Sequence, residues 1–287
     1  MTQQIRAATP TICVVGSVNL DIVAACPRLP TPGETVTDAT LSRYPGGKGA
    51  NQALAARRQG AEVTLIAAVG NDSPAGEALG MLRDGGVDLS RLLTVDSQST
   101  GVALIVVDQQ GENQIAVAPG ANRHLHSRHI DTEGFDAVLC QLEINEDAVI
   151  TAAHGATGLF CLNAAPARPI PEPVLERADL IIVNEIEQET LRDQLTRFEG
   201  LLVVTRGARG AEAYRRGNLI ATAQSPSIEA VDTVGAGDAF CGSLVVDLAR
   251  GIDIDVALQQ ACRAGAVAAT RVGAQPSLPT HEDLESG

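Results

Sequence analysis

The sequence is poor in aromatic residues and in lysine. Only 2% of its 287 residues are aromatic and tryptophan is absent, so a buried core must be built from Val, Leu, Ile and Ala. Lys48 is the sole lysine among 21 basic residues, and the net charge is −14. This excess of acid argues against binding to nucleic acid or to anionic membranes. A phosphate ligand would need a local binding site strong enough to overcome the negative electrostatic field of the whole protein.

Long apolar runs and paired cysteines are also missing. No run approaches the ~20 apolar residues of a membrane span, so we expect no membrane association. The opening segment, Met1 to Pro10, is short and polar, and we expect no secretory signal there. Six cysteines are scattered without any C-x-x-C pair. We therefore expect reduced thiols in a cytoplasmic protein.

Several common catalytic patterns are absent. No Gly-x-Ser-x-Gly occurs, which argues against a serine hydrolase elbow. No G-x-G-x-x-G follows the first apolar run, which argues against a dinucleotide fold. His124, His126 and His129 match no usual zinc spacing, so we interpret them as surface residues.

The apolar runs alternate with helical patterns over most of the chain. This rhythm predicts an α/β fold with a mostly parallel central sheet between helices. Alternating pieces at 34–44 and 102–117 predict a small β-sheet lid. We expect one α/β domain over residues 1–287, with lid segments at about 17–45 and 100–118. The strands are expected at 11–15, 63–69, 102–107, 114–117, 137–142, 159–162, 180–183, 201–204 and 227–231.

Residues 45–53 form a glycine-rich segment, Pro-Gly-Gly-Lys-Gly-Ala-Asn-Gln-Ala, that leads into an amphipathic helix ending near Gly60. Successive glycines before a helix allow a ligand to approach the backbone closely. The segment is not a Walker A loop, because Ser42 stands where the first glycine should be and Gly49 follows Lys48. Glycines alone are a weak signal, but these enclose the only lysine and precede Asn51.

A second glycine segment, Asp232-Thr-Val-Gly-Ala-Gly-Asp238-Ala-Phe, precedes another apolar helix. Unpaired N–H groups and the helix dipole make a helix start a natural anion site. A carboxylate beside such a site repels the anion, unless its task is to take a proton from a nucleophile that attacks a phosphate. An ordinary helix start with Gly in the turn and Asp in the first turn is the alternative.

Polar residues end several of the predicted strands, where open α/β sheets bind their ligands. Asn19 and Asp21 follow the first strand, although they could simply shape a turn. Glu143 could bind a sugar hydroxyl or meet water. Asn184-x-x-Glu187 reads as a capping box for a helix running to about Phe198, and also suits a hydrated Mg²⁺ next to phosphates. Asn122 is expected to be a helix N-cap.

These two glycine segments resemble the signatures of the ribokinase family within the phosphofructokinase-B type sugar kinases. The likeness runs from about Ile12 to Pro279, and Gly-Ala-Gln-Pro-Ser at 273–277 also matches the family. The resemblance implies a central sheet with a β lid over the sugar. It implies an ATP-dependent kinase that acts on the primary hydroxyl of D-ribose. An exposed face on a small β lid also favours pairing of two copies, so we expect a homodimer through the lid. Another kinase of the family, for a nucleoside, fructose or a keto-deoxy sugar acid, is the alternative, and a non-catalytic sugar-binding protein is a further one.

The resemblance also implies roles for individual residues. Asp238 would be the base, and the amides of Gly235, Ala236 and Gly237 would stabilise the developing charge. The sugar would be bound by Asn19, Asp21, Gly47, Lys48, Asn51 and Glu143. The nucleotide would be bound by Asn184, Thr205, Gly207, Gly210 and Gly237, with Glu187 serving Mg²⁺. A monovalent cation, usually K⁺, would be held by Asp232, Val234, Ala268, Gly273 and Ser277.

Two positions depart from the family pattern. Arg206 stands between Thr205 and Gly207, where an apolar residue is usual. Cys262 stands where His or Asn is common. Both are expected in the nucleotide cleft, so they bear on nucleotide affinity rather than on sugar identity.

Overall fold

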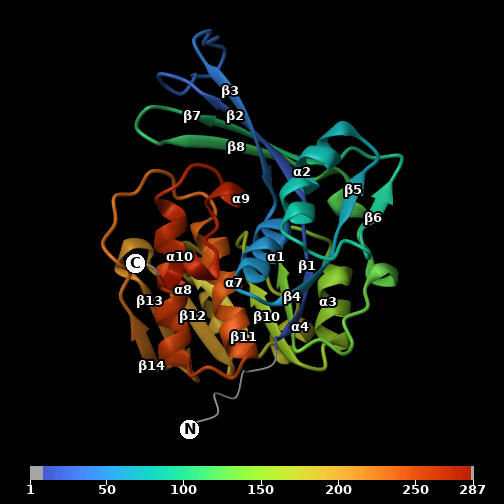
Figure 1. Cartoon of the computed structure of the whole chain (residues 1–287), viewed down its shortest axis with the longest axis vertical. Helices are drawn as coiled ribbons and strands as arrows, with labels where there is room; N and C mark the ends of the chain where they lie inside the picture. Colours follow the sequence, from blue (N-terminus) through green and yellow to red (C-terminus); the bar gives the residue numbers. More distant parts are fainter. Residues whose placement is uncertain (1–8, 286–287) are drawn as a thin grey trace.

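An eight-stranded sheet lies at the centre of the computed structural model, which describes residues 9–285 (Figure 1). Most of the opening segment, predicted to carry no secretory signal, lies outside these residues. The strand order is β14-β13-β12-β11-β10-β9-β1-β4, and only β13 runs antiparallel to the other strands. The strands are β1 (Thr11–Val15), β4 (Glu62–Ile66), β9 (Ala137–Gln141), β10 (Leu159–Asn163), β11 (Leu180–Asn184), β12 (Leu201–Thr205), β13 (Ala211–Arg215) and β14 (Asn218–Ala223).

Helices cover both faces of this sheet because successive strand residues point to opposite sides. Ile12 and Val14 of β1 belong to one buried core, and Cys13 and Val15 belong to the other. The first core is covered by α1 (Lys48–Arg58), α2 (Ser73–Asp84), α7 (Ala236–Ala249), α8 (Ile254–Ala269) and α10 (His281–Glu285). The second is covered by α3 (Glu146–Gly155), α4 (Glu172–Arg177) and α6 (Arg192–Leu195), while α5 (Glu185–Thr190) lies against β11.

A separate four-stranded sheet stands above the main one and forms the lid (Figure 1). Its order is β3-β2-β7-β8, in which β2 and β7 are parallel and the outer pairs antiparallel. The strands are β2 (Asn19–Ala25), β3 (Thr40–Gly46), β7 (Gly101–Val107) and β8 (Asn113–Ala118). Residues 34–37, the first part of the alternating piece expected at 34–44, lie in a loop instead. The predicted fold, a mostly parallel sheet between helices with a small β lid, is confirmed.

Two predicted elements are each divided in the structure. The strand predicted at 63–69 breaks after β4, because β5 (Ala68–Gly70) leaves the main sheet and pairs with β6 (Leu93–Val95). The helix predicted to run to Phe198 breaks between α5 and α6 at Leu191.

The strand predicted at 227–231 is wrong. These residues form a loop, and the N–H of Val231 donates to the carbonyl oxygen of Ala269 at 2.8 Å instead of joining a sheet. The antiparallel strands β13 and β14, which close this edge of the main sheet, were not predicted.

All six cysteines are buried and unpaired. Of the helices that the structure describes, none combines the length and apolarity needed to cross a bilayer.

Candidate active site

A polar pocket of about 370 Å³ opens at the carboxyl edge of the main sheet, and lid strands form part of its wall. Ala103, Ile105, Ile115 and Val117 are the apolar lid residues in that wall. The pocket brings together predicted site residues from segments far apart in the chain: Asn19, Asp21, Gly47, Lys48, Asn51, Glu143, Asn184, Glu187, Thr205, Val234, Gly235, Gly237 and Asp238.

A second pocket, of about 520 Å³, adjoins the first and is largely apolar. Its lining includes Ile228, Phe240 and Cys262, together with three predicted site residues, Gly207, Gly210 and Ala236. Thr205, Thr233 and Gly237 line both pockets. The polar and the apolar pocket therefore meet at the N-terminus of α7.

The start of α7 depends on glycine at position 235. Gly235 is left-handed, with φ 82° and ψ −10°, and a Cβ there would lie 2.9 Å from the Cα of Ala274. The first N–H groups of a helix have no partner within it, so they are free to bind a ligand. In this structure the N–H of Ala236 donates to the carbonyl oxygen of Thr233 at 3.2 Å.

Asp238 lies in the first turn of α7, and two amide groups hold its carboxylate. Asn51 Nδ2 donates to Oδ2 and Gln52 Nε2 donates to Oδ1, each at 2.9 Å. Burial raises the pKa of Asp238, while Lys48 and the two amide donors act in the opposite direction. The carboxylate is oriented from two sides and touches the polar pocket.

Lys48 is the only cation among the residues that line the polar pocket, facing four carboxylates. Burial disfavours its charge, but Asp238, Glu143 and Glu187 outweigh burial and raise the pKa of Lys48. Burial, together with repulsion from Glu143 and Asp238, raises the pKa of Asp21 to about 7. The pocket is thus acidic on balance, and a polyphosphate would enter it only with counter-cations.

The amide of Asn19 is fixed by Asn122. The backbone N–H of Val18 donates to Asn122 Oδ1 at 3.0 Å, and Asn122 Nδ2 donates to Val18 O at 3.1 Å. The same Nδ2 donates to Asn19 Oδ1 at 2.8 Å, so Asn19 can offer only its NH₂ group to the pocket. The N-cap predicted for Asn122 is wrong, because this residue lies buried within the 3₁₀ helix η1 (Gly120–His124), whose N-cap is Pro119.

Glu143 lies against the start of α1. Its Oε2 accepts a hydrogen bond from the N–H of Lys48 at 3.1 Å and another from the hydroxyl of Ser17. A carboxylate at a helix N-terminus is favoured by the dipole. The close packing of this region needs glycine at position 47, where φ is 89° and a Cβ would lie 2.7 Å from the N atom of Asn19.

Asn184 and Glu187 form the predicted capping box of α5. Glu187 N donates to Asn184 Oδ1, and Asn184 N donates to Glu187 Oε2, both at 2.8 Å. Glu187 also lines the polar pocket, where burial raises its pKa against the opposing effects of the Asn184 N–H and Lys48. The cap is therefore confirmed, and it leaves a buried carboxylate beside the pocket.

The two departures from the family pattern differ in their consequences. Arg206 does not line either pocket; its guanidinium pairs with Glu212 at 2.6 Å and Glu185 at 3.1 Å. Tyr214 donates its hydroxyl proton to the same Glu212. The charge of Arg206 is thus neutralised outside the cleft, whereas Cys262 does line the apolar pocket.

The residues expected to hold a monovalent cation lie in neither pocket, apart from Val234. Asp232 joins two of their segments, because its Oδ1 accepts from the N–H of Val234 at 3.0 Å and its Oδ2 from the N–H of Gly273 at 2.9 Å. Ser277 is buried in the short helix α9 (Ala274–Ser277), and the carbonyl oxygen of Ala268 accepts from the N–H of Arg271 at 3.1 Å. The contact between Gly235 and Ala274 brings this cluster against the start of α7.

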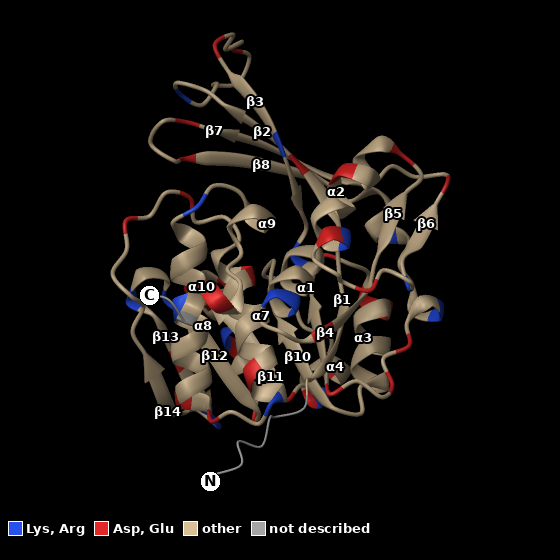
Figure 2. Ribbon diagram, in the orientation of Figure 1, with Lys and Arg blue, Asp and Glu red and all other residues tan. Residues whose placement is uncertain are grey.

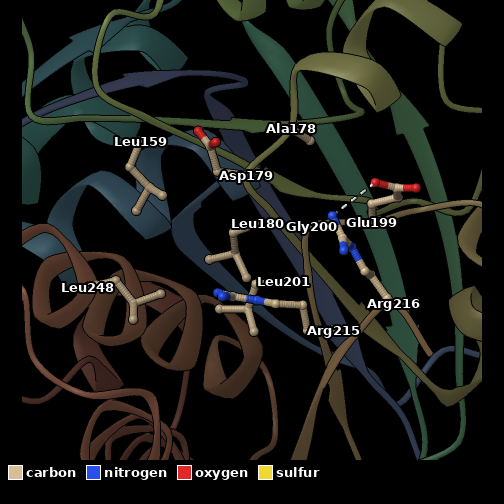
Figure 3. Close-up of a pocket in the computed structure, with 10 residues that line it drawn as sticks. All are labelled: Leu159, Ala178, Asp179, Leu180, Glu199, Gly200, Leu201, Arg215, Arg216 and Leu248. Carbon is tan, nitrogen blue, oxygen red and sulfur yellow. Dashed lines mark hydrogen bonds and ion pairs between the residues drawn. The ribbon is translucent and has the colours of Figure 1, made fainter. Parts of the chain in front are cut away.

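A larger hollow, of about 660 Å³, lies at the opposite edge of the sheet (Figure 3). Leu159, Leu180 and Leu201 begin their strands there, and an ion pair joins Arg216 to Glu199 across its rim. No predicted site residue lines it. Within residues 9–285, no group of three or more His, Cys, Asp or Glu side chains is arranged to hold a metal ion.

The sequence did not single out Gln52, Thr233 or Asn122 as part of the site. Gln52 and Thr233 lie inside the two glycine segments, so their place in those segments was an available signal. Asn122 had no such signal, since it meets Asn19 only through the fold.

Comparison with known proteins agrees with this architecture. The model of the pfkB family of carbohydrate kinases matches residues 9–281. A ribokinase from Bacillus subtilis is 37% identical over 96% of this chain and 98% of its own length.

Solved structures give the same result. A ribokinase structure from Thermotoga maritima superposes with a TM-score of 0.88 at 30% identity, covering 96% of this chain and 98% of that one. A ribokinase from Arabidopsis thaliana, solved with ribose and ATP, has a TM-score of 0.85 at 27% identity, with coverage of 96% and 98%. The chain belongs to the pfkB family of carbohydrate kinases.

Proposed function

We propose that this carbohydrate kinase transfers the γ-phosphate of Mg·ATP to the primary (5-) hydroxyl of D-ribose. The observation that carries the proposal is the position of Asp238. It lines the polar pocket and directly follows Gly237, which lines both pockets. A sugar in the polar pocket and a nucleotide in the apolar one would meet at this carboxylate.

Similarity to other proteins supports the choice of substrates. The Bacillus subtilis and Thermotoga maritima relatives are ribokinases, and the Arabidopsis ribokinase was solved with ribose and ATP. The residues that line the polar pocket suit a polyol, because they combine hydrogen-bond donors with acceptors.

In the proposed sugar site, Asn19 donates from its NH₂ group to a hydroxyl oxygen, while Asp21 and Glu143 accept from hydroxyl protons. Gly47 and Lys48 would also contact the sugar, at the start of α1. Asn51 Oδ1 is buried without a hydrogen-bond partner, although the residue lines the pocket. A sugar hydroxyl would supply that missing donor.

In the proposed reaction, Asp238 takes the proton of the 5-hydroxyl. The hydroxyl oxygen then forms a bond to the γ-phosphorus, and the bond from that phosphorus to the bridging oxygen breaks, releasing ADP. General base catalysis of this kind contributes about 10²–10⁴-fold. The N–H groups of Gly235 and Gly237, joined by that of Ala236 when it leaves the carbonyl oxygen of Thr233, lie at the positive end of the α7 dipole and stabilise the charge that develops on the phosphoryl group.

The nucleotide would occupy the apolar pocket, with Thr205, Gly207 and Gly210 in its wall. Asn184 would serve the phosphates from the end of β11. Because Arg206 is paired with acids outside the cleft, we expect it to leave nucleotide affinity largely unaffected. Cys262 lines the apolar pocket, where it would contact the adenine ring in place of the His or Asn that is common in the family.

The donor groups fit a hydrated Mg²⁺ beside Glu187. This carboxylate is buried and lines a pocket with more acids than cations, which is where a counter-cation is needed. Mg²⁺ is usually held by one or two carboxylates together with substrate phosphates. When bound, it would neutralise charge on the phosphates.

The donor set around Asp232 fits a hard monovalent cation such as K⁺. The proposed ligands are the carboxylate of Asp232, the buried hydroxyl of Ser277 and the carbonyl oxygens of Val234, Ala268 and Gly273. A cation there would add positive field near the N-terminus of α7, since Gly235 packs against Ala274 in the same cluster.

We also propose a homodimer formed through the lid. Its strand pairing puts Ile22, Leu104 and Ala116 in one row, facing away from the row that contains Asp21 and lines the pocket. Leu104 is 52% exposed and Leu41, on the same outer face, is 67% exposed. Figure 2 shows few charged residues on the lid strands. Leu104→Glu should yield a monomer by light scattering, and an unchanged mass would contradict this pairing.

A cytoplasmic location fits the proposed use of ATP and the six unpaired cysteines.

Two alternatives follow from the same site. Another sugar or nucleoside kinase of the family would use the same base with different lid contacts. A non-catalytic sugar-binding protein is disfavoured, because binding alone requires no carboxylate beside an anion site.

An ATP-consumption assay over D-ribose, 2-deoxy-D-ribose, D-fructose, a keto-deoxy sugar acid and several nucleosides tests the proposal. We expect D-ribose to give the highest kcat/KM, with ribose 5-phosphate as product. A preference for a different acceptor would overturn the substrate, and no turnover with any acceptor would favour the binding protein.

A further inference from the structure

Gln52 is a fully buried amide in the middle of α1, and its side chain is bonded on every side. Its Oε1 accepts from Gln141 Nε2 at 2.7 Å. Its Nε2 donates to Asn163 Oδ1 and to Asp238 Oδ1, each at 2.9 Å. All the hydrogens of the NH₂ group are therefore used, and one of them is directed at Asp238.

The direction of this amide is set by the main chain. Asn163 Nδ2 donates to the carbonyl oxygen of Ile182 at 3.2 Å, which can only accept. Asn163 must therefore present its oxygen to Gln52, and Gln52 must present its nitrogen. Through Gln52, the network links the ends of β9 and β10 and the middle of β11 to a single oxygen of Asp238.

The two helices that carry Gln52 and Asp238 are in close contact. Gly242 of α7 packs so tightly against α1 that a Cβ there would lie 2.6 Å from the Cβ of Ala55. The contact limits relative movement of the helices, so the bond between Gln52 and Asp238 is built into the fold before any ligand arrives.

We propose that Gln52 is a positioning residue for the kinase reaction, and this inference rests on the proposed role of Asp238 as the base. Gln52 and Asn51 each donate to a different oxygen of Asp238, which fixes the plane of the carboxylate. Both bonds favour the ionised form, the only form able to take a proton from the sugar hydroxyl. Gln52 itself does not line the pocket.

Without these two amide donors, the surroundings of Asp238 would favour its protonated form. Asp238 is 8% exposed, and Glu143 acts on it as a like charge. Asp21 and the thiol of Cys241 are also near, and Lys48 is the cation that opposes these effects. The amide donors therefore supplement one ammonium group against burial and neighbouring acids.

The test compares Gln52→Met with Gln59→Met. Gln59 is also buried and directly follows α1. It donates to the carbonyl oxygen of Pro279, and neither residue lines the polar pocket. Gln52→Met loses three buried hydrogen bonds and Gln59→Met loses one, so both should have a lower Tm, with the larger decrease in Gln52→Met. Only Gln52→Met should move the acid limb of the kcat/KM profile, upward by about one pH unit or more, and lower kcat at pH 7 by ~10-fold or more.

Gln52→Glu is a second test. It keeps the shape of the side chain and replaces the donor with a like charge, which should also shift the acid limb of the kcat/KM profile to higher pH. A folded variant with either substitution whose acid limb stays in place would overturn the inference. If neither variant folds, Gln52 is a structural residue and the inference falls. If the parent is active and Asp238→Asn is as active as the parent, the proposed base has failed instead.

Discussion

Asn122 Nδ2 lies 2.8 Å from Asn19 Oδ1, and this hydrogen bond determines which end of the Asn19 amide faces the polar pocket. Asn122→Ala should release that amide and raise KM for ribose by about tenfold, with a smaller effect on kcat, because it acts on sugar binding. Asn145→Ala is the control. Asn145 bonds the carbonyl of Leu125, close to η1, and should leave KM unchanged. An unchanged KM in Asn122→Ala would remove Asn19 from the sugar site.

Gly235→Ala should abolish most turnover. Gly235 has φ 82° and packs against Ala274, so a side chain would shift the start of α7 and its N–H groups. Loss of donors at comparable sites lowers kcat by about 10²–10³. Gly251→Ala is a matched control, since Gly251 has φ 76° with open space where a Cβ would lie. Equal kcat values for the two variants would contradict the role of this helix start.

The contribution of Asp21 to the stability of the folded protein should depend on pH in a defined direction. Its pKa is raised from 3.8 to about 7, so the folded state binds this proton more tightly than the unfolded chain does. Stability from this group is therefore lost as pH rises from about 4 to 7. Asp21→Asn should raise Tm at pH 8 by about 2 °C or more and change it little at pH 4. The measurement is calorimetry at both values, and an equal change at both would show that Asp21 titrates normally.

Much of the fold followed from local patterns. The buried strands were predictable because they are short, apolar and β-branched, and the starts of α1 and α7 because glycines precede them. The hairpin of β13 and β14 was missed because Glu212, Tyr214 and Arg215 obscure its apolar alternation. The loop at 227–231 has strand-like residues but bonds to the end of α8.

The site was predictable where its residues lie within the signature segments. Asp238, Gly235 and Asn51 belong to two such segments, and the fold brings them to one pocket. Residues that act through others could not be found in this way. Asn122 reaches Asn19 from 103 positions away, a contact that no local pattern encodes.

The proposed K⁺ site predicts a specific salt dependence. Replacing K⁺ with choline at constant ionic strength should lower kcat, because the cation would strengthen the positive field at the start of α7. Asp232→Asn should show little response to the same exchange, since it removes the carboxylate that joins Val234 and Gly273. Equal rates of the parent in both salts would count against this site.

The most direct test of the account is the turnover and sugar binding of Asp238→Asn. The substitution keeps the shape of the side chain and removes the only proposed proton acceptor. We predict that kcat falls by about 10²–10⁴-fold while Kd for ribose, measured by calorimetry, stays close to that of the parent. A variant whose kcat lies within tenfold of the parent would contradict the assignment of Asp238 as the base.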